Sequence, residues 1–159
     1  MRKIAYADPP YIGQSNRYTE KQEVDHAELI PTLMAYDAWA LSCSSPSLQY
    51  ILSLCSPNVR VAAWVKPFCS FKPNVNPAYA WEPVVFYGAR KRSRNELTVR
   101  DWVIANITLQ KGLVGAKPEA FCYWLFELLG AKTEDSFDDL FPGTGIVTRC
   151  WETWKGRML

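Results

Sequence analysis

The chain has 159 residues, of which 48% are hydrophobic and 21% charged, with a formal net charge of +2. This length and composition are typical of one globular domain with a sizeable core, and no apolar stretch is long enough for a membrane span. The small net charge gives no argument for nucleic-acid binding by itself, and because the N-terminus lacks the apolar core of a signal peptide, we expect a cytoplasmic protein.

Strands and helices alternate along the chain. In chain order, the hydrophobic pattern predicts a strand at 2–8, a polar loop at 12–25, a helix that begins beside Asp25, a strand at 37–44, a helix at 45–55 and a strand at 59–67. There follow a proline-rich loop at 68–80, a strand at 81–88, a basic connector at 89–102, a helix at 117–131 that stops at Gly130, a strand from 135 into a glycine turn, and a helix at 147–154. With no repeat or domain boundary, this order predicts a single domain over 1–159 with a mostly parallel, doubly wound α/β sheet of about five strands.

The only histidine, His26, lies at the start of the first predicted helix. Asp25 and Glu28 stand at capping-box spacing there, whereas Pro31 fits poorly inside a helix and predicts a kink or a later start. We expect His26 on the surface. Because the five cysteines form no close pair, the sequence argues against a metal site, and a single histidine argues against a histidine-based triad.

Two prolines interrupt the first apolar strand directly after an acid, in the sequence "ADPPY". Adjacent prolines remove two backbone donors and fix two φ angles, so a strand cannot continue through them. The motif alone leaves two interpretations open. It is either a rigid turn, or a strand end that presents Asp8 and Tyr11 in a fixed frame for chemistry.

A glycine loop, "DDLFPGTGIV", stands where the last predicted strand turns into a helix. Glycines at such a turn let a ligand approach the backbone and face the helix N-terminus, which is the usual arrangement of nucleotide-like cofactor sites. It is not a G-x-G-x-x-G fingerprint, because Thr148 occupies the third position. Alone it is weak evidence for a cofactor.

Together, Asp8-Pro9-Pro10-Tyr11 and the later Asp139-x-Phe141-x-Gly143-x-Gly145 resemble the amino-methyltransferase family, whose members use S-adenosylmethionine to methylate exocyclic amines of nucleic-acid bases. The D-P-P-Y form looks like the adenine-N6 subgroup. The motif order is similar to the permuted beta group and to mRNA adenine methyltransferases, in a compact phage-like form. The segments "WEPVVFYG" and "AKPEAFCYWLFELLGA" also match, so the resemblance covers most of the chain.

The resemblance implies a Rossmann-like class I methyltransferase fold that methylates adenine N6 in DNA. Asp8 and the Pro9 carbonyl would each accept one N6 hydrogen, while Tyr11 would stack on a flipped-out or single-stranded base and Pro10 would keep Tyr11 and Asp8 in register. The resemblance suggests a cofactor pocket lined by Asp8, Lys117, Pro118, Asp139, Phe141, Gly143, Thr144 and Gly145. A solvated cation stays an alternative for Lys117, and plain core packing for Phe141.

A short basic insertion around 88–115 stands where larger relatives carry their target-recognition region. Its cations are candidates for phosphate contact above the expected active face, with a solvated loop as the alternative. The candidates are Arg90, Lys91, Arg92 and Arg94, with Arg17 and Lys66 as weaker ones.

The resemblance is incomplete at the C-terminal end, where the family pattern continues into a strand whose acidic end holds the cofactor ribose. Two strands of the full family sheet are therefore expected to be absent. Three hypotheses follow: a homodimer or partner subunit covers the open sheet edge near Asp139, the enzyme prefers single strands, or it binds the cofactor weakly. RNA adenine-N6 methylation, cytosine-N4 methylation and a non-catalytic nucleic-acid-binding relative stay open as alternative functions.

Overall fold

A six-stranded sheet forms the centre of the computed structural model, which describes residues 1–17, 22–68, 72–107 and 116–157. The strand order is β5-β3-β4-β2-β1-β6. The strands are β1 (Lys3–Ala7), β2 (Ala38–Ser42), β3 (Arg60–Val65), β4 (Trp81–Tyr87), β5 (Trp102–Ile104) and β6 (Ser136–Asp139). Because β4 pairs antiparallel with both neighbours and every other pairing is parallel, five strands run in one direction and β4 runs in the other. The mostly parallel α/β sheet is thus confirmed, and β5 is an additional strand that begins at the last residue of the predicted connector, within the predicted insertion around 88–115.

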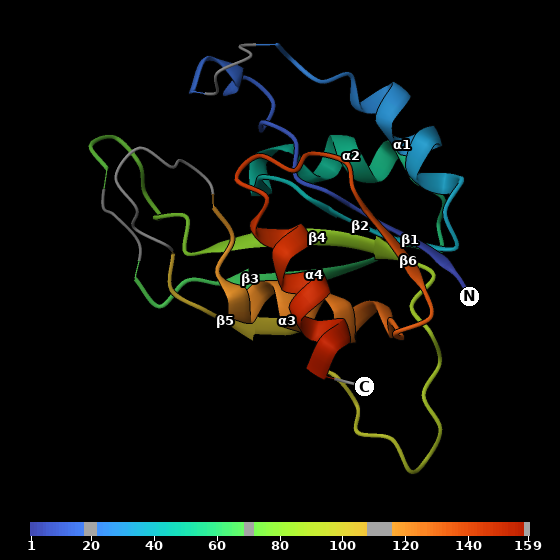
Figure 1. The fold of residues 1–159 in the computed structure, drawn as a ribbon. Coiled ribbons are helices and arrows are strands. Elements are labelled where there is room, and N and C mark those ends of the chain that lie inside the picture. The colour runs from blue at the N-terminus through green and yellow to red at the C-terminus, as the bar shows by residue number, and fades with distance from the viewer. Residues whose placement is uncertain (18–21, 69–71, 108–115, 158–159) are drawn as a thin grey trace.

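Two pairs of helices cover the two faces of this sheet (Figure 1). On one face lie α1 (His26–Met34) and α2 (Leu48–Leu54), and on the other lie α3 (Glu119–Leu129) and α4 (Ile146–Arg157). Side chains of β1 alternate between two cores: Ile4 and Tyr6 belong to the core under α3 and α4, and Ala5 and Ala7 to the core under α1 and α2. Every residue of β2 is buried, as expected of a central strand covered on both faces. None of the helices described here is both long and apolar enough to cross a lipid bilayer.

The first helix begins where the capping signal places it. The Asp25 carboxylate accepts a hydrogen bond from the Ala27 backbone N–H at 2.8 Å, and the helix continues through Pro31, so a later start is ruled out. The expectation that His26 lies on the surface is wrong: the residue is only 4% exposed. Its position falls on the same helical face as Leu29, Ile30 and Leu33, which packs on the sheet, and its Nδ1 lies 3.0 Å from the Val24 carbonyl oxygen.

Gly88 and Gly130 end two elements in the left-handed backbone region. Gly130 caps α3 with φ 63°, which confirms the predicted stop. Gly88 follows β4 with φ 71°, and a Cβ there would lie 2.1 Å from the Asp37 carbonyl oxygen. The end of β4 therefore passes against the residue that precedes β2 so closely that only glycine fits without a shift.

Candidate active site

One edge of the sheet collects most of the charged side chains that the sheet buries. The carboxyl ends of β1, β3 and β6 reach this edge, and the antiparallel β4 brings its amino end to the same place. Parallel strands present their carboxyl ends together, and ligands of open α/β sheets bind outside those ends. The residues assembled here are Asp8, Lys66, Glu82 and Asp139 from the sheet, and Lys117 from just before α3.

Four of these side chains form an alternating chain of charges, which we call the ion cluster: Lys66, Glu82, Lys117 and Asp8. The Lys117 Nζ lies 3.0 Å from Asp8 Oδ1 and 3.2 Å from Glu82 Oε2. The other Glu82 oxygen binds the Lys66 ammonium. The Lys117 side chain is 5% exposed and its Nζ also lies 5.2 Å from the centre of the Trp64 ring, so it is not a solvated cation at a helix start.

Burial and the neighbouring charges shift the pKa values within the ion cluster. Burial raises the pKa of Asp8 above its usual 3.8, and the positive charge of Lys117 opposes this only in part. Burial likewise raises the pKa of Glu82, but Lys117 and Lys66 together outweigh it, and the pKa of Glu82 falls below 4.5. For Lys117, burial lowers the pKa, but the two carboxylates raise it more, so the lysine stays protonated. The cluster thus holds two positive charges around two carboxyl groups.

The D-P-P-Y segment enters this cluster from the end of β1. Asp8 follows the last strand residue and its side chain is 20% exposed, whereas Pro9 is buried. Tyr11 is half-buried, and burial raises its pKa, with the nearby negative charge of Glu82 adding to the rise. The segment is therefore both a rigid turn, closed by the Gln14 N–H on the Tyr11 carbonyl at 2.8 Å, and a frame that holds Asp8 and Tyr11 at one cluster.

The glycine loop follows β6, the strand next to β1, with Tyr6 and Asp139 in register. Gly143 and Gly145 have φ values of 46° and 71°, and α4 begins directly after them. Phe141 is half-buried and packs against the core under α1 and α2, as its alternative interpretation expected. Asp139 accepts from the Thr148 hydroxyl at 3.4 Å through Oδ2, while its Oδ1 is buried without a hydrogen-bond partner among the described residues. Burial raises the pKa of Asp139 above 3.8, with nearby Asp8 adding to the rise.

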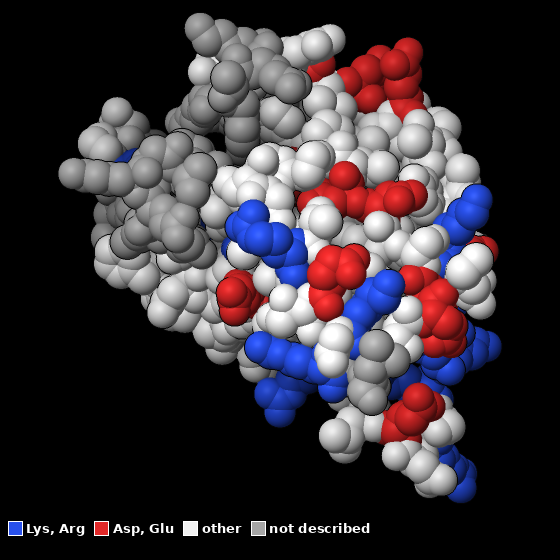
Figure 2. All heavy atoms as spheres, viewed as in Figure 1, with Lys and Arg blue, Asp and Glu red and all other residues white. Residues whose placement is uncertain are grey.

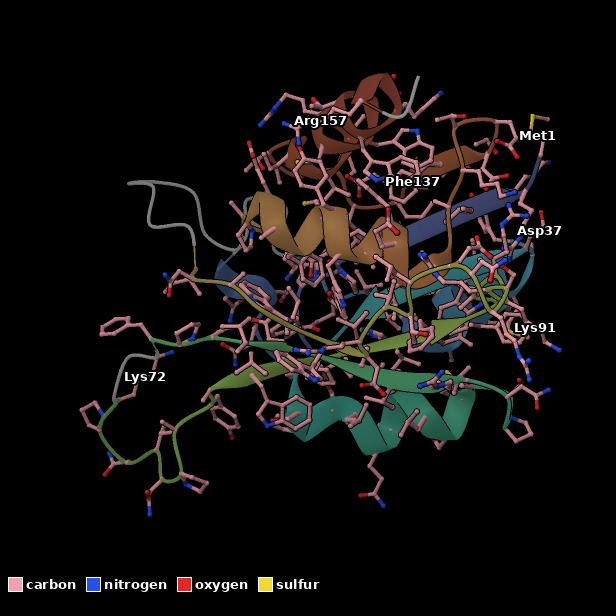
Figure 3. The ribbon with its side chains drawn as sticks, turned by 90° about the horizontal axis from the view of Figure 1, so that it is seen from below. Met1, Asp37, Lys72, Lys91, Phe137 and Arg157 are labelled. Atoms are coloured by element: carbon pink, nitrogen blue, oxygen red, sulfur yellow. The ribbon has the colours of Figure 1, made fainter. Side chains whose placement is uncertain are left out.

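The basic connector lies at the opposite edge of the sheet, so the expectation that it stands above the active face is wrong. Because β4 is antiparallel, its carboxyl end leads away from Asp8. Arg90 pairs with buried Asp135 at 2.8 Å, and Arg92 pairs with Glu127, in the last turn of α3, at 2.7 Å. Lys91 and Asp37 both lie at the end of the molecule away from Lys72 (Figure 3).

The remaining cations predicted for nucleic-acid contact are placed differently. Lys66 is a member of the ion cluster and also lies over the Trp64 ring at 4.8 Å. Arg94 lies in the exposed part of the connector, and Arg17 ends the short 3-10 turn Ser15–Arg17. Residues 108–115 of the predicted insertion lie outside the described residues. On the face shown in Figure 2, basic side chains are interspersed with acidic ones and form no continuous basic surface among the residues drawn.

Two hollows adjoin the 3-10 turn η2 (Ser45–Ser47) after β2. A cavity of about 500 Å³ is lined by Ile12 and Tyr50 together with residues at the start of α1. A second, of about 310 Å³, is lined by 74–79 and by Trp81, which directly precedes Glu82. Tyr50 is 48% exposed and Trp81 40% exposed, so aromatic rings lie open to solvent beside the D-P-P-Y segment.

The sequence alone did not indicate Glu82, which links Lys66 and Lys117. It stands inside an apolar strand motif, and only its glutamate character among hydrophobic neighbours marks it. A charged residue in a strand that is otherwise buried must find a partner, and that signal could have found it. Lys117 and Asp8 were predicted as separate parts of a cofactor site, and the structure brings them into direct contact.

The chain resembles solved structures in fold, although no protein-family model and no curated protein matches its sequence. The crystal structure of the M1.HpyAVI–SAM complex superposes with a TM-score of 0.66 at 16% identity, covering 97% of this chain and 78% of that one. The crystal structure of M1.HpyAVI gives a TM-score of 0.57 at 16% identity, covering 97% and 76%. At this identity the likeness establishes the fold, which is the Rossmann-like α/β sheet expected from the sequence.

Proposed function

We propose that this protein transfers a methyl group from S-adenosylmethionine to the exocyclic N6 amine of adenine in DNA. The observation that carries the proposal is that β1 and β6 are neighbours, in register at Tyr6 and Asp139, so that the D-P-P-Y segment and the glycine loop leave the sheet side by side. One supplies acceptors for an amine and the other a backbone that a cofactor can approach. The fold shared with the M1.HpyAVI–SAM complex supports the same pairing of groups.

The residues of this edge fit S-adenosylmethionine chemically. The cofactor carries a positive sulfonium and a positive ammonium, and it supplies an already activated methyl group. Asp139 Oδ1 is buried with no partner among the described residues, which suits an acceptor for the ammonium. Gly143 is exposed, with nothing nearer than the Phe141 carbonyl oxygen at 3.9 Å from a Cβ built on it, so a ligand could approach its backbone. Asp8 and Asp139 place negative charge on the same side as the sulfonium would occupy.

The chain's own groups would make the amine reactive. An adenine N6 lone pair is delocalised into the ring, so the amine is a poor nucleophile. Asp8 and the Pro9 carbonyl, by accepting its two hydrogens, favour a pyramidal nitrogen whose lone pair points at the methyl carbon. The nitrogen–carbon bond forms as the carbon–sulfur bond breaks with its electron pair on sulfur, and the methylated nitrogen then releases one proton to solvent. No metal is needed for this step.

Tyr11 would hold the base. Its half-buried ring follows the two prolines, and base–aromatic stacking contributes about 1–3 kcal/mol per base. The base must leave a duplex or come from a single strand to reach Asp8. Open aromatic rings at Tyr50 and Trp81, together with the mixed charge of the face in Figure 2, favour a single-stranded or unpaired target over a long duplex.

The test is transfer of labelled methyl to matched DNA and RNA oligonucleotides, single- and double-stranded, followed by nucleoside analysis. We expect N6-methyladenine in DNA, and loss of transfer in Asp8→Ala, while Glu152→Gln on the exposed face of α4 serves as the matched control. Greater transfer to RNA would favour the RNA enzyme, and N4-methylcytosine would favour the cytosine enzyme. If S-adenosylmethionine does not bind in calorimetry, the protein is instead a non-catalytic nucleic-acid-binding relative.

The remaining part of the proposal concerns the outer edge of the sheet along strand β6, which differs from the edge at the strand ends that holds Asp8. β6 stands at the end of the strand order and pairs only with β1 among the described residues, which leaves its outer edge unpaired. Exposed strand edges are usually covered or blunted. We propose that a second copy or a partner subunit covers β6, and sedimentation with and without cofactor and DNA measures this. A monomer in every condition would contradict the second copy and leave a partner subunit as the cover.

A further inference from the structure

Glu82 has no part in the transfer chemistry proposed above, yet it is the residue of the ion cluster that binds both lysines. It lies at the second position of β4, and its side chain is 13% exposed. One oxygen binds Lys66, and the other lies 3.2 Å from Lys117. A buried carboxylate costs free energy unless it is paired, so a position that holds one between two lysines calls for an explanation.

We propose that Glu82 is a positioning residue for the D-P-P-Y segment: by sharing Lys117 with Asp8, it leaves Asp8 one free carboxylate oxygen. The inference rests on the proposed methyl transfer, because it concerns the acceptor that the amine needs. Asp8 touches Lys117 through Oδ1, at 3.0 Å. The second Asp8 oxygen is the one that would accept a hydrogen bond from the amine.

Charge sharing is what makes Glu82 necessary for this. An ammonium has three donors and binds two carboxylates at once, so Lys117 divides its attraction between Asp8 and Glu82. Without Glu82, Lys117 would have Asp8 as its only carboxylate partner in the cluster and would draw both Asp8 oxygens toward itself. Lys66 would lose its carboxylate at the same time, leaving a net positive charge at the place where a sulfonium must bind.

Glu82 also lies near Tyr11: burial raises the pKa of the Tyr11 hydroxyl, and the nearby charge of Glu82 raises it further. The link from Glu82 to Asp8 runs through Lys117. A purely structural salt bridge would stabilise β4 and α3 but would leave the rate and pH dependence of methyl transfer unchanged.

The test compares Glu82→Gln with wild type and with Glu152→Gln, an exposed acid on α4, in single-turnover transfer of labelled methyl to adenine-containing DNA. We expect the Glu82→Gln rate to fall at least about tenfold, the size of effect that misplacing a reacting group by a fraction of an ångström produces. We expect S-adenosylmethionine to bind more weakly as well, but by a smaller factor than the rate falls, because the added positive charge acts on the sulfonium in the ground state and the transition state alike. The acid limb of the rate should move to lower pH, because the negative charge of Glu82 raises the pKa of Asp8.

A second variant, Glu82→Asp, separates position from charge and serves if Glu82→Gln does not fold. It keeps the negative charge but shortens the side chain by one methylene, so the rate should fall while the acid limb stays at the wild-type pH. An active wild type whose Glu82→Gln and Glu82→Asp variants are folded and transfer methyl at the wild-type rate would overturn the positioning role alone. A wild type that binds S-adenosylmethionine but methylates no nucleic acid would overturn the proposed function, and the positioning role with it.

Discussion

Removing the charge of Lys117 should move the pH dependence of methyl transfer toward neutrality. Lys117→Met keeps the length of the buried side chain and deletes the cation that lies 3.0 Å from Asp8 Oδ1. At an effective dielectric constant of about 20, two unit charges at that distance attract by roughly 5 kcal/mol. Because the Asp8 side chain is 20% exposed, solvent reduces this effect. The pKa of Asp8 therefore rises further in the variant, because the positive charge that opposes the effect of burial is gone.

The sign follows from the proposed role of Asp8 as an acceptor for the amine. In that role Asp8 must be a carboxylate to accept a hydrogen bond from the amine, so transfer is lost as the pH falls through its pKa, which is already above 3.8 in the wild type. Without Lys117 that loss begins at a higher pH. The assay is single-turnover transfer of labelled methyl from about pH 5 to pH 9, a range set by the expected pKa rise. Thermal unfolding at each pH confirms that the variant is folded.

The matched control is Lys117→Arg, which keeps the positive charge and should keep the acid limb within a fraction of a pH unit of wild type. Lys117→Met and Glu82→Gln should shift the limb in opposite directions, since Lys117 lowers the pKa of Asp8 and Glu82 raises it. An acid limb that stays at the wild-type pH in folded Lys117→Met would refute the assignment of Asp8 as the titrating acceptor. It would also refute the electrostatic coupling within the ion cluster.

Three further predictions concern the fold and the base. Gly88→Ala should lower the free energy of unfolding, measured in urea, by about 3 kcal/mol, because its Cβ would meet the Asp37 carbonyl oxygen at 2.1 Å. Gly156→Ala is the control: it has open space in α4 and should raise the free energy of unfolding by about 0.5–1 kcal/mol. Asp135→Asn should lower the free energy of unfolding by about 2 kcal/mol at pH 7. Burial raises the pKa of Asp135, but hydrogen bonds from the Arg2 and Lys132 backbone N–H groups and from Arg90 lower it by more. The stabilisation by Asp135 is therefore present above about pH 4 and disappears as the pH falls through the lowered pKa. Tyr11→Ala should raise KM for the oligonucleotide by about fivefold to a hundredfold, the equivalent of losing one stacked base, and an unchanged KM would contradict the stacking role.

The central elements of the fold could be predicted because their signals are local. The strands that became β1, β2, β3 and β4 are short apolar runs bounded by polar or proline-rich segments, which is the usual pattern of a buried strand in an α/β chain. The strand that became β6, with the sequence SFDD, was instead predicted together with the glycine turn that follows it. The end of α3 at Gly130 likewise depends on one residue, because glycine adopts φ 63° without strain. The neighbouring positions of the D-P-P-Y segment and the glycine loop came from the family resemblance.

Burial at the sheet margin could not be predicted in the same way. β5 has three residues, two of them exposed, and it exists because Trp102–Ile104 pair with β3 at the end of the sheet. Its residues, Trp-Val-Ile, form an apolar run, but one shorter than those of the predicted strands and placed at the end of the basic connector. His26 was misplaced because a polar side chain at a helix start looks solvated in sequence, although its position on the buried helical face decides otherwise.

The direction of β4 explains why the basic connector was wrongly expected over the site and why Glu82 was not predicted to belong to it. A strand of seven apolar-rich residues carries no local sign of whether it runs with its neighbours or against them. Because β4 runs against them, its first residues, including Glu82, reach the edge that holds Asp8, and its last residues lead the basic connector to the other edge. Had β4 been parallel, the connector would stand over Asp8 as expected, and Lys117 would have one carboxylate partner instead of two. The antiparallel direction of β4 therefore places the arginines away from the site and also brings Glu82 to it, where Lys117 contacts both Asp8 and Glu82.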